Sequence, residues 1–320
     1  MRKLLTVLLA LSAYVLLLPG AQAFPDRPIK LVVASPAGSP PDVMARLVSD
    51  KMAGILGQPV VVENRPGAGG TIGSKSAAAA EPDGYTLLLG STSNLLIAPA
   101  VYKNAGYNAA TFTPISRIAD SSEILAVHPS VAAKSVGELV SLAKSKPGTL
   151  NFASAGNGTL PHIEGELLKA QAKIDINHVP YRGGANALTG LVGGQVQMMF
   201  TVLTQMLPYI QEGRVRGLAI ASAKRSERAP DLPTMVESGF PDYVTTSVTV
   251  LVAPPNTPAA IRQQLSKAVV AALGSEEAQK VLARLGGEAR PSTPEELATF
   301  LAAQQAHWSG IIKATNISIE

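Results

Sequence analysis

Residues 59–73 read PVVVENRPGAGGTIG. The first part, Pro59–Glu63, is a short apolar run typical of a buried strand. Four glycines follow within seven positions, and a helix is expected over Ile72–Ala80. A strand that passes through a tight loop into a helix is the repeating unit of α/β sheets, so this stretch predicts that fold class.

The neighbouring segments extend the same alternation. Ile29–Ala34 and Thr86–Leu89 read as buried strands, and a helix is expected from Pro41 to about Gly54. Together with the opening stretch they form a β-α-β-α-β unit, which implies a parallel sheet with right-handed crossovers.

The rest of the chain supplies enough strands for a second sheet. Two lobes fit domain-size statistics better than one doubly wound domain of nearly 300 residues. Strands are expected at 115–119, 125–128, 151–154, 176–180, 198–200, 218–221 and 248–253. Helices are expected at 135–144, from the turn at 156–159 to about 170, at 185–191 and at 204–211. Two or three more are expected at the end, the last opening on a capping box at 293–296.

The glycine-rich loop does not match a nucleotide-binding motif. A dinucleotide fingerprint counted from Gly67 requires glycine where Ile72 stands, and Gly73-Ser74-Lys75 has the wrong order for a phosphate-binding P-loop. Two interpretations remain open, namely a small-anion site at a helix start and a tight turn without a ligand.

The N-terminus has the pattern of a secretory signal peptide. Arg2 and Lys3 precede the apolar stretch Leu4–Leu18, and Ala21-Gln22-Ala23 is a cleavage site. An uncleaved anchor is the alternative, but 15 apolar residues are short for a span of about 20. We therefore expect export, cleavage after Ala23 and a soluble periplasmic protein.

Composition excludes several function classes. The chain has no cysteine, which excludes disulfides, thiolate metal sites and the lipid-anchored form of an exported protein. The formal charge of +4 falls to +2 without Arg2 and Lys3, leaving 25 basic against 23 acidic residues. No basic run alternates with aromatic residues, so nucleic acid is not an expected partner.

Polar loops follow several of the predicted strands. SPAGSPPD, residues 35–42, links the first strand to the first helix; Ser91-Thr92 and the segment from Ser154 to Thr159 follow two others. Ligands of open α/β sheets bind at the carboxyl ends of strands, so these loops are candidate ligand contacts. Helix capping is the alternative role of the same residue types.

No pattern supports catalysis. The chain has neither G-x-S-x-G nor H-E-x-x-H, and the i, i+4 pair of His162 and Glu166 lacks a third metal ligand. We expect no enzyme, no cofactor and no metal. A secreted serine hydrolase that uses Ser154 or Ser91 with His162 is the least favoured hypothesis.

The motifs in their order resemble one known family. VVVENRPGAGGTIG, AEPDGYTLLLGSTSN, LNFASAGNGTLPHIEGEL, VPYRGGANAL, GGQVQMMF and LVAPPNTP span nearly the whole mature chain. This set is similar to the substrate-binding proteins of tripartite tricarboxylate transporters, the Bug receptors. The resemblance implies a periplasmic, two-lobed Venus-flytrap receptor whose lobes are sheets flanked by helices. It also implies a small organic acid in the interlobe cleft, and transient delivery to a membrane permease.

The resemblance also implies lobe boundaries and site residues. The chain is expected to cross between lobes near 120–125 and 244–250, giving one lobe from 24–123 and 248–320 and the other from 124–247. The implied ligand contacts are Ala37, Gly38, Ser39, Ser91, Thr92, Ser154, Gly158, Thr159 and Thr201, and Asp42 is expected to be structural. A monomer is expected, and a ligand-sensing subunit for a membrane signalling protein is the alternative role.

This chain departs from the family pattern in three places. The first loop has Ser39-Pro40-Pro41 where P-x-G-G-S/G-T-D is usual, which removes a backbone donor and a hydroxyl. Thr201 stands where many members carry Asp, which argues against a ligand with an ammonium group. Residues 246–248 lack the usual aromatic side chain, which predicts a wider cleft.

Overall fold

The computed structural model of the protein describes residues 24–315 and 317–319. The signal peptide and its cleavage site fall on residues 1–23 and lie outside the described residues. Within the described ranges, no helix is long and apolar enough to cross a membrane.

The strands join into one continuous, mixed sheet with the order β2-β1-β3-β9-β4-β7-β5-β6, and β8 and β10 also pair with β4. The β1–β2, β1–β3, β5–β6 and β5–β7 pairs are parallel, as the βαβ pattern predicts. The strands are β1 (Ile29–Val33), β2 (Val60–Asn64), β3 (Thr86–Ser91), β4 (Thr113–Val127), β5 (Asn151–Ser154), β6 (Asn177–Pro180), β7 (Met198–Val202), β8 (Arg216–Ile220), β9 (Thr246–Ala253) and β10 (Gly287–Ala289).

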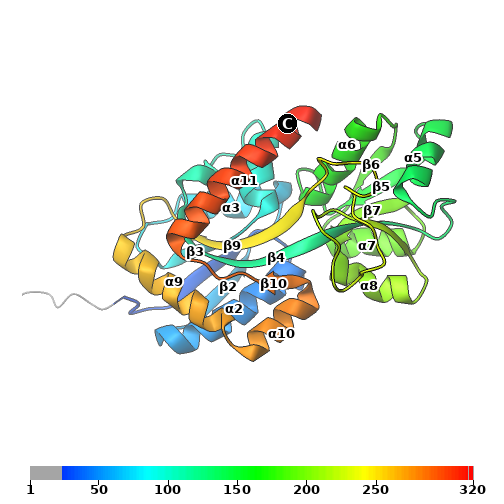
Figure 1. Cartoon of the computed structure of the whole chain (residues 1–320). Helices are drawn as coiled ribbons and strands as arrows, with labels where there is room; N and C mark the ends of the chain where they lie inside the picture. Colours follow the sequence, from blue (N-terminus) through cyan, green and yellow to red (C-terminus); the bar gives the residue numbers. More distant parts are fainter. Residues whose placement is uncertain (1–23, 316, 320) are drawn as a thin grey trace, which may run out of the picture.

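Helices cover both faces of this sheet. In one half, α2, α9 and α10 lie on one side, while α3 and α11 lie on the other (Figure 1). The helices are α2 (Pro40–Leu56), α3 (Thr71–Ala78), α4 (Ala98–Val101), α5 (Val136–Ser145), α6 (Leu160–Ala172), α7 (Gly184–Val192), α8 (Leu203–Gln211), α9 (Ala259–Leu273), α10 (Glu276–Leu285) and α11 (Pro294–Thr315). Short helical turns occupy Ala68–Gly70, Thr92–Ile97 and Ala109–Thr111.

The strand β4 belongs to both halves of the molecule. Residues 113–122 pair with β9, and residues 123–127 pair with β7. In Figure 1, β4 and β9 run side by side from the half that holds β1–β3 towards the half that holds β5–β8. We call these the first half and the second half.

The prediction of two separate strands at 115–119 and 125–128 was wrong, because β4 is continuous through the polar residues between them. Ser121 and Ser122 pair with Ser247 and Thr246 of β9, so their backbone groups remain in the sheet. The register of β4 also shifts twice in this pairing, between Pro114 and Ser116 and between Arg117 and Ala119. Bulges of this kind bend a strand locally without ending it.

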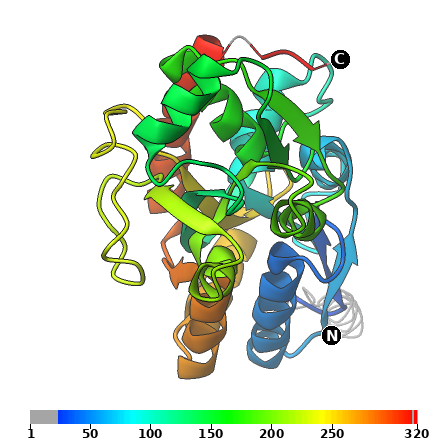
Figure 2. The same ribbon diagram turned by 90° about the vertical axis from the view of Figure 1, so that its right-hand side faces the viewer.

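The first helix runs from Pro40 to Leu56, slightly longer than the predicted span from Pro41 to about Gly54. Two prolines occupy its first positions, where a helix does not need a backbone N–H. Gly57 ends it with φ of 70°, and its N–H donates to the carbonyl oxygen of Ala53 at 3.0 Å. Met44, Val48 and Met52 are buried on one side of α2, in the apolar layer shared with α9. An end-on view shows α2 (blue) beside α10 (orange) at the base of the first half (Figure 2).

Candidate functional site

A cavity of about 760 Å³ lies between the two halves. This volume falls in the range of small-molecule sites. Its lining residues come from the loops at strand ends and from the junction of β4 and β9: Ser35, Pro36, Ser39, Pro66–Gly70, Ser91, Ser93, Asn94, Ser121, Glu123, Ala155–Asn157, Thr159, Tyr181–Gly184, Thr201, Ser247 and Thr249, among others. The carboxyl ends of strands therefore meet at one cleft, as the topology predicts.

The first loop is braced by Asp42. The buried Asp42 carboxylate accepts hydrogen bonds from Gly38 N at 2.8 Å, Asn64 Nδ2 at 2.9 Å and Arg46 Nε at 3.0 Å. Burial alone would raise the Asp42 pKa, but these hydrogen bonds and the Arg46 charge outweigh it and hold the pKa below its ordinary value. Ser39 lines the cavity, whereas Ala37 and Gly38 do not. Asp42 thus has the structural role expected for it.

At the end of β3, the two predicted residues separate. Ser91 lines the cavity, and its Oγ accepts from Asn94 N at 3.4 Å while Asn94 Oδ1 accepts from Ser91 N at 2.6 Å. Thr92 is buried and does not line the cavity. Its hydroxyl donates to Thr246 O at 3.1 Å and accepts from Val248 N at 2.9 Å, which ties this turn to β9.

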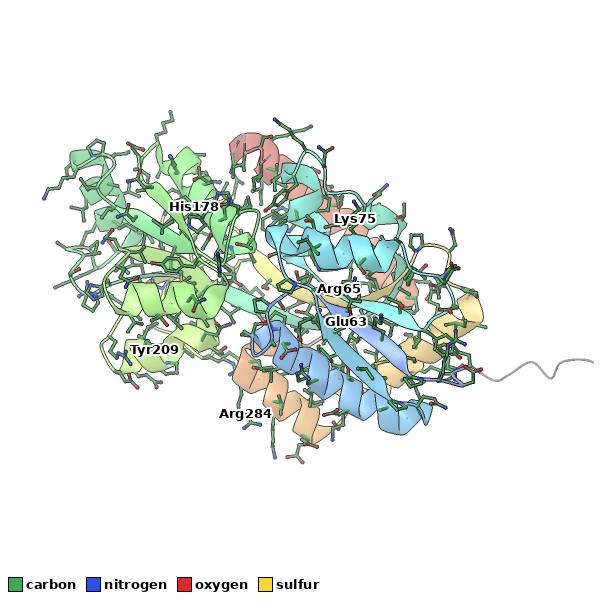
Figure 3. The ribbon with its side chains drawn as sticks, turned by 180° about the vertical axis from the view of Figure 1, so that it is seen from behind. Glu63, Arg65, Lys75, His178, Tyr209 and Arg284 are labelled. Carbon is green, nitrogen blue, oxygen red and sulfur yellow. The ribbon has the colours of Figure 1, made fainter. Side chains whose placement is uncertain are left out.

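Ser154 lies beneath the cavity wall with no exposed surface. Its Oγ is 2.6 Å from His178 Nε2 and accepts from Gly156 N at 3.1 Å. The His178 ring stacks on that of His162 at 4.0 Å between centroids. Figure 3 shows His178 in the second half of the molecule. Burial lowers the pKa of His162 to about 4, and burial together with His162 lowers that of His178 to about 3, so both rings are neutral at pH 7.

The remaining predicted residues divide in the same way. Thr159 and Thr201 line the cavity, and Gly158 does not. Thr159 precedes α6 and donates its hydroxyl to Gly156 O at 2.6 Å, and Gly158 N donates to His162 Nδ1 at 3.2 Å. Ser39, Ser91, Thr159 and Thr201 are thus brought together, while Ala37, Gly38, Thr92, Ser154 and Gly158 lie outside the lining.

The glycine-rich loop brings the two halves into contact. Pro66–Gly70 lines the cavity, and a Cβ at Gly69 would lie 3.2 Å from the carbonyl oxygens of Asn157 and Gly158 in the second half. Tyr102 of the first half enters the same junction and donates its hydroxyl to Asn157 O at 3.0 Å. Close backbone approach, rather than nucleotide binding, is what the glycines allow here.

Further contacts also join the halves. Leu160 N, at the start of α6, donates to Ser93 Oγ at 3.1 Å, and Arg228 Nη1 donates to Ala283 O near the end of α10 at 3.0 Å. On the latter side Gly286 packs so closely that a Cβ would lie 2.1 Å from Thr204 Oγ1. The structure therefore has its two halves in contact around the cavity.

One basic side chain lines the cavity among the residues that the structure describes. Arg182 follows β6, is exposed, and its guanidinium has no partner within the described ranges. Next to it, Gly183 and Gly184 line the cavity at the start of α7, where the helix dipole favours an anion. The positive charge in the cavity lining thus lies where α7 begins.

Two acidic side chains, Glu123 and Glu164, are buried near the cavity. Glu123 of β4 lines the cavity and is 2% exposed, and Glu164 of α6 is fully buried. The Oε2 atom of each has no hydrogen-bond partner. Burial raises the pKa of Glu123 to about 8, and burial together with the Glu123 charge raises that of Glu164 well above its ordinary value.

Residues 44–317 match the family model described as the tripartite tricarboxylate transporter family receptor. The chain belongs to this family. BugT of Bordetella pertussis is 33% identical over 302 residues, which cover 94% of this chain and 93% of BugT.

Solved structures show the same receptor fold. The periplasmic binding protein BugD matches with a TM-score of 0.85 at 34% identity, covering 93% of this chain and all of that one. MatC from Rhodopseudomonas palustris, solved with bound malate, matches with a TM-score of 0.84 at 34% identity over 90% of this chain and all of that one. The expected α/β periplasmic-binding-protein fold is confirmed.

In this receptor the hydrolase hypothesis has no geometric support. Ser154 contacts His178 rather than His162, and it has no surface from which to attack a substrate. Ser91 is engaged with Asn94 at the turn that it caps. Within residues 24–315 and 317–319, no three His, Cys, Asp or Glu side chains are grouped to hold a metal ion.

Arg182 and Glu123 are receptor residues that the sequence analysis did not single out. Arg182 lies in VPYRGG directly after a strand, so the strand-end rule applied to the other loops could have found it. Glu123 lies between two apolar runs and looked like part of a break in the strand. The structure shows that it lies in continuous β4 and lines the cavity.

Proposed function

We propose that this receptor binds a small organic acid in the cavity and passes it to an integral-membrane permease after export to the periplasm. The observation that carries the proposal is the unpaired Arg182 guanidinium in a cavity whose other polar lining is mostly neutral. A carboxylate would accept charge-assisted hydrogen bonds there and meet the N–H groups that begin α7. The malate held by MatC supports the same class of ligand.

The binding residues form two walls. We assign Ser39 and Ser91 to the first wall, and Thr159, Thr201 and Arg182 to the second, because all of them line the cavity. The predicted residues outside the lining shape the loops instead: Ala37, Gly38, Thr92, Ser154 and Gly158.

Residues 24–123 with 248–320 would move as one lobe and residues 124–247 as the other. The proposed crossings, near 120–125 and 244–250, include the stretch where residues 120–122 of β4 pair with residues 246–248 of β9. Opening about this pair of strands would expose the cavity, and closing would bury the ligand. Binding without chemistry is the role that this arrangement supports.

Arg182→Gln is expected to weaken carboxylate binding by roughly 10- to 100-fold, because a hydrogen bond to a charged group contributes about 1.5–3 kcal/mol. The test is a thermal-shift screen of mono-, di- and tricarboxylates including malate. Isothermal titration of the best acid follows, with the unmodified protein and the variant.

Arg214→Gln is the matched control, since Arg214 pairs with Glu212 in the same half and does not line the cavity. It should bind the acid as the unmodified protein does. The proposal fails if no carboxylate in the screen binds, or if Arg182→Gln binds the best acid with unchanged affinity.

A further inference from the structure

The buried acids Glu123 and Glu164 are arranged without a counter-charge. Glu164 Oε1 accepts a hydrogen bond from Thr245 Oγ1, and its backbone oxygen accepts one from the Tyr243 hydroxyl. The backbone oxygen of Glu123 accepts a hydrogen bond from Ala221 N at 2.8 Å, but none of the described residues donates to its carboxyl Oε2. No Lys, Arg or His in the described ranges forms an ion pair with either acid.

The neighbours of Glu123 offer no proton donor that could satisfy it. Its partner across the strand pair is Val202, and the next pair along is Ile124 with Thr201. The titratable groups in this part of the core are Glu164 of α6 and Tyr243, and neither bonds to Glu123 Oε2: the Tyr243 hydroxyl donates to Glu164 O, and Glu164 Oε2 has no partner. A buried polar atom without a partner is costly, so a group that enters the cavity is the remaining candidate donor.

The two buried acids, Glu123 and Glu164, determine which charge on a ligand group is favoured in the cavity. Burial raises the pKa of Glu123 to about 8, so Glu123 carries a proton at pH 7 while the cavity is empty. A neutral hydroxyl would leave that proton in place, whereas a cation would displace it. A cationic nitrogen supplies both a hydrogen-bond donor and the missing positive charge.

The separation of Glu123 and Arg182 along the sheet limits the size of such a ligand. In the sheet order, β7 and β5 separate β4, which carries Glu123, from β6, which precedes Arg182. Three strand spacings give about 14 Å between these backbones. The Glu and Arg side chains extend into that interval, which leaves room for a small zwitterion.

We propose that Glu123 binds a cationic nitrogen of the solute, so that this receptor selects an amino-carboxylate over the oxygen acid of the same shape. The inference rests on the proposed function for the carboxylate end, which Arg182 holds. The threonine at position 201 predicts that an ammonium ligand is disfavoured. Glu123, on the neighbouring strand β4, would supply the acidic group instead.

The test uses two pairs of probes that differ at the nitrogen: aspartate against malate, and 4-aminobutyrate against glutarate. Titration calorimetry at pH 7 is expected to show at least one nitrogen member binding 10-fold or more tightly than its partner. Its binding should also release a proton, because Glu123 must ionise, and this appears as a heat that depends on the ionisation enthalpy of the buffer.

Glu123→Gln is expected to reduce the preference for nitrogen to within about 3-fold and to abolish the proton release. The variant should fold, since it removes an uncompensated buried acid. Glu166→Gln is the matched control: Glu166 is on the same helix as Glu164, half-buried and outside the cavity lining, and the variant should keep the preference.

The outcomes separate this inference from the proposed function. Equal or tighter binding of malate and glutarate, or a preference that survives in Glu123→Gln, overturns the inference and leaves a carboxylate receptor. If no carboxylate binds, butylamine decides: Glu123-dependent binding of this amine keeps the inference while the proposed function fails. If butylamine does not bind either, both are overturned.

Discussion

Relative to the unmodified protein, a Glu164→Gln protein is expected to become more stable as pH rises from 5 to 8, with the smallest difference at pH 5. Glu164 is fully buried, and its pKa in the folded state lies well above the ordinary value of 4.5, through burial and the Glu123 charge. Above that ordinary value the unfolded chain loses a proton that the folded chain keeps. The stability that Glu164 contributes to the unmodified protein is therefore fully present below pH 4.5. It falls by about 1.4 kcal/mol per pH unit as pH rises from there towards the folded-state pKa.

Urea unfolding of both proteins at pH 5, 6, 7 and 8 measures this difference. Groups whose pKa is lowered on folding, such as Asp42, affect both proteins equally and cancel in the comparison. Glu81→Gln, at an exposed position, is the control and should run parallel to the unmodified protein. Parallel curves for Glu164→Gln would mean that this carboxyl finds a partner on folding and that the acid pair is not uncompensated.

The strands were predictable because their signal is local. Apolar runs such as Ile29–Ala34 and Pro59–Glu63 fall on β1 and β2, and the capping box at 293–296 forms as expected, with Glu296 N donating to Thr293 Oγ1 at 3.2 Å. The signal for the continuity of β4 is not local. Its polar centre stays in the sheet only because β9, more than 100 residues later, supplies matching hydrogen bonds.

The candidate site was harder to predict, because a sequence gives a hydroxyl but not the direction in which it points. Ser91 and Ser154 both follow strands, yet one lines the cavity and the other bonds beneath it to His178. Their capping and ligand-binding roles have the same local pattern. Glu123 and Arg182 are the charged side chains that line the cavity within the described residues, but the sequence does not show that the two lie in one site.

Gly158→Ala is expected to weaken ligand binding by roughly 10-fold or more, because a Cβ at this position would lie 2.5 Å from Tyr102 Cε2. The two residues belong to different halves, so the clash exists only when the halves are together. A closed state made less favourable by about 1.4 kcal/mol lowers apparent affinity 10-fold, provided that the ligand needs closure. Calorimetric titration with the best acid from the thermal-shift screen measures the loss.

The alanine also carries a backbone cost, since Gly158 has φ of +70°. Gly213 has φ of +69° with no atom within 4 Å of its added Cβ, so Gly213→Ala carries the same strain without the clash. It should lower stability and leave affinity unchanged. Combining Gly158→Ala with Tyr102→Ala removes the obstructing ring and should restore most of the affinity lost relative to Tyr102→Ala alone. If the double variant loses as much affinity as the two single variants lose together, the Tyr102 ring is not what obstructs closure. The glycine at 158 would then serve its local loop alone.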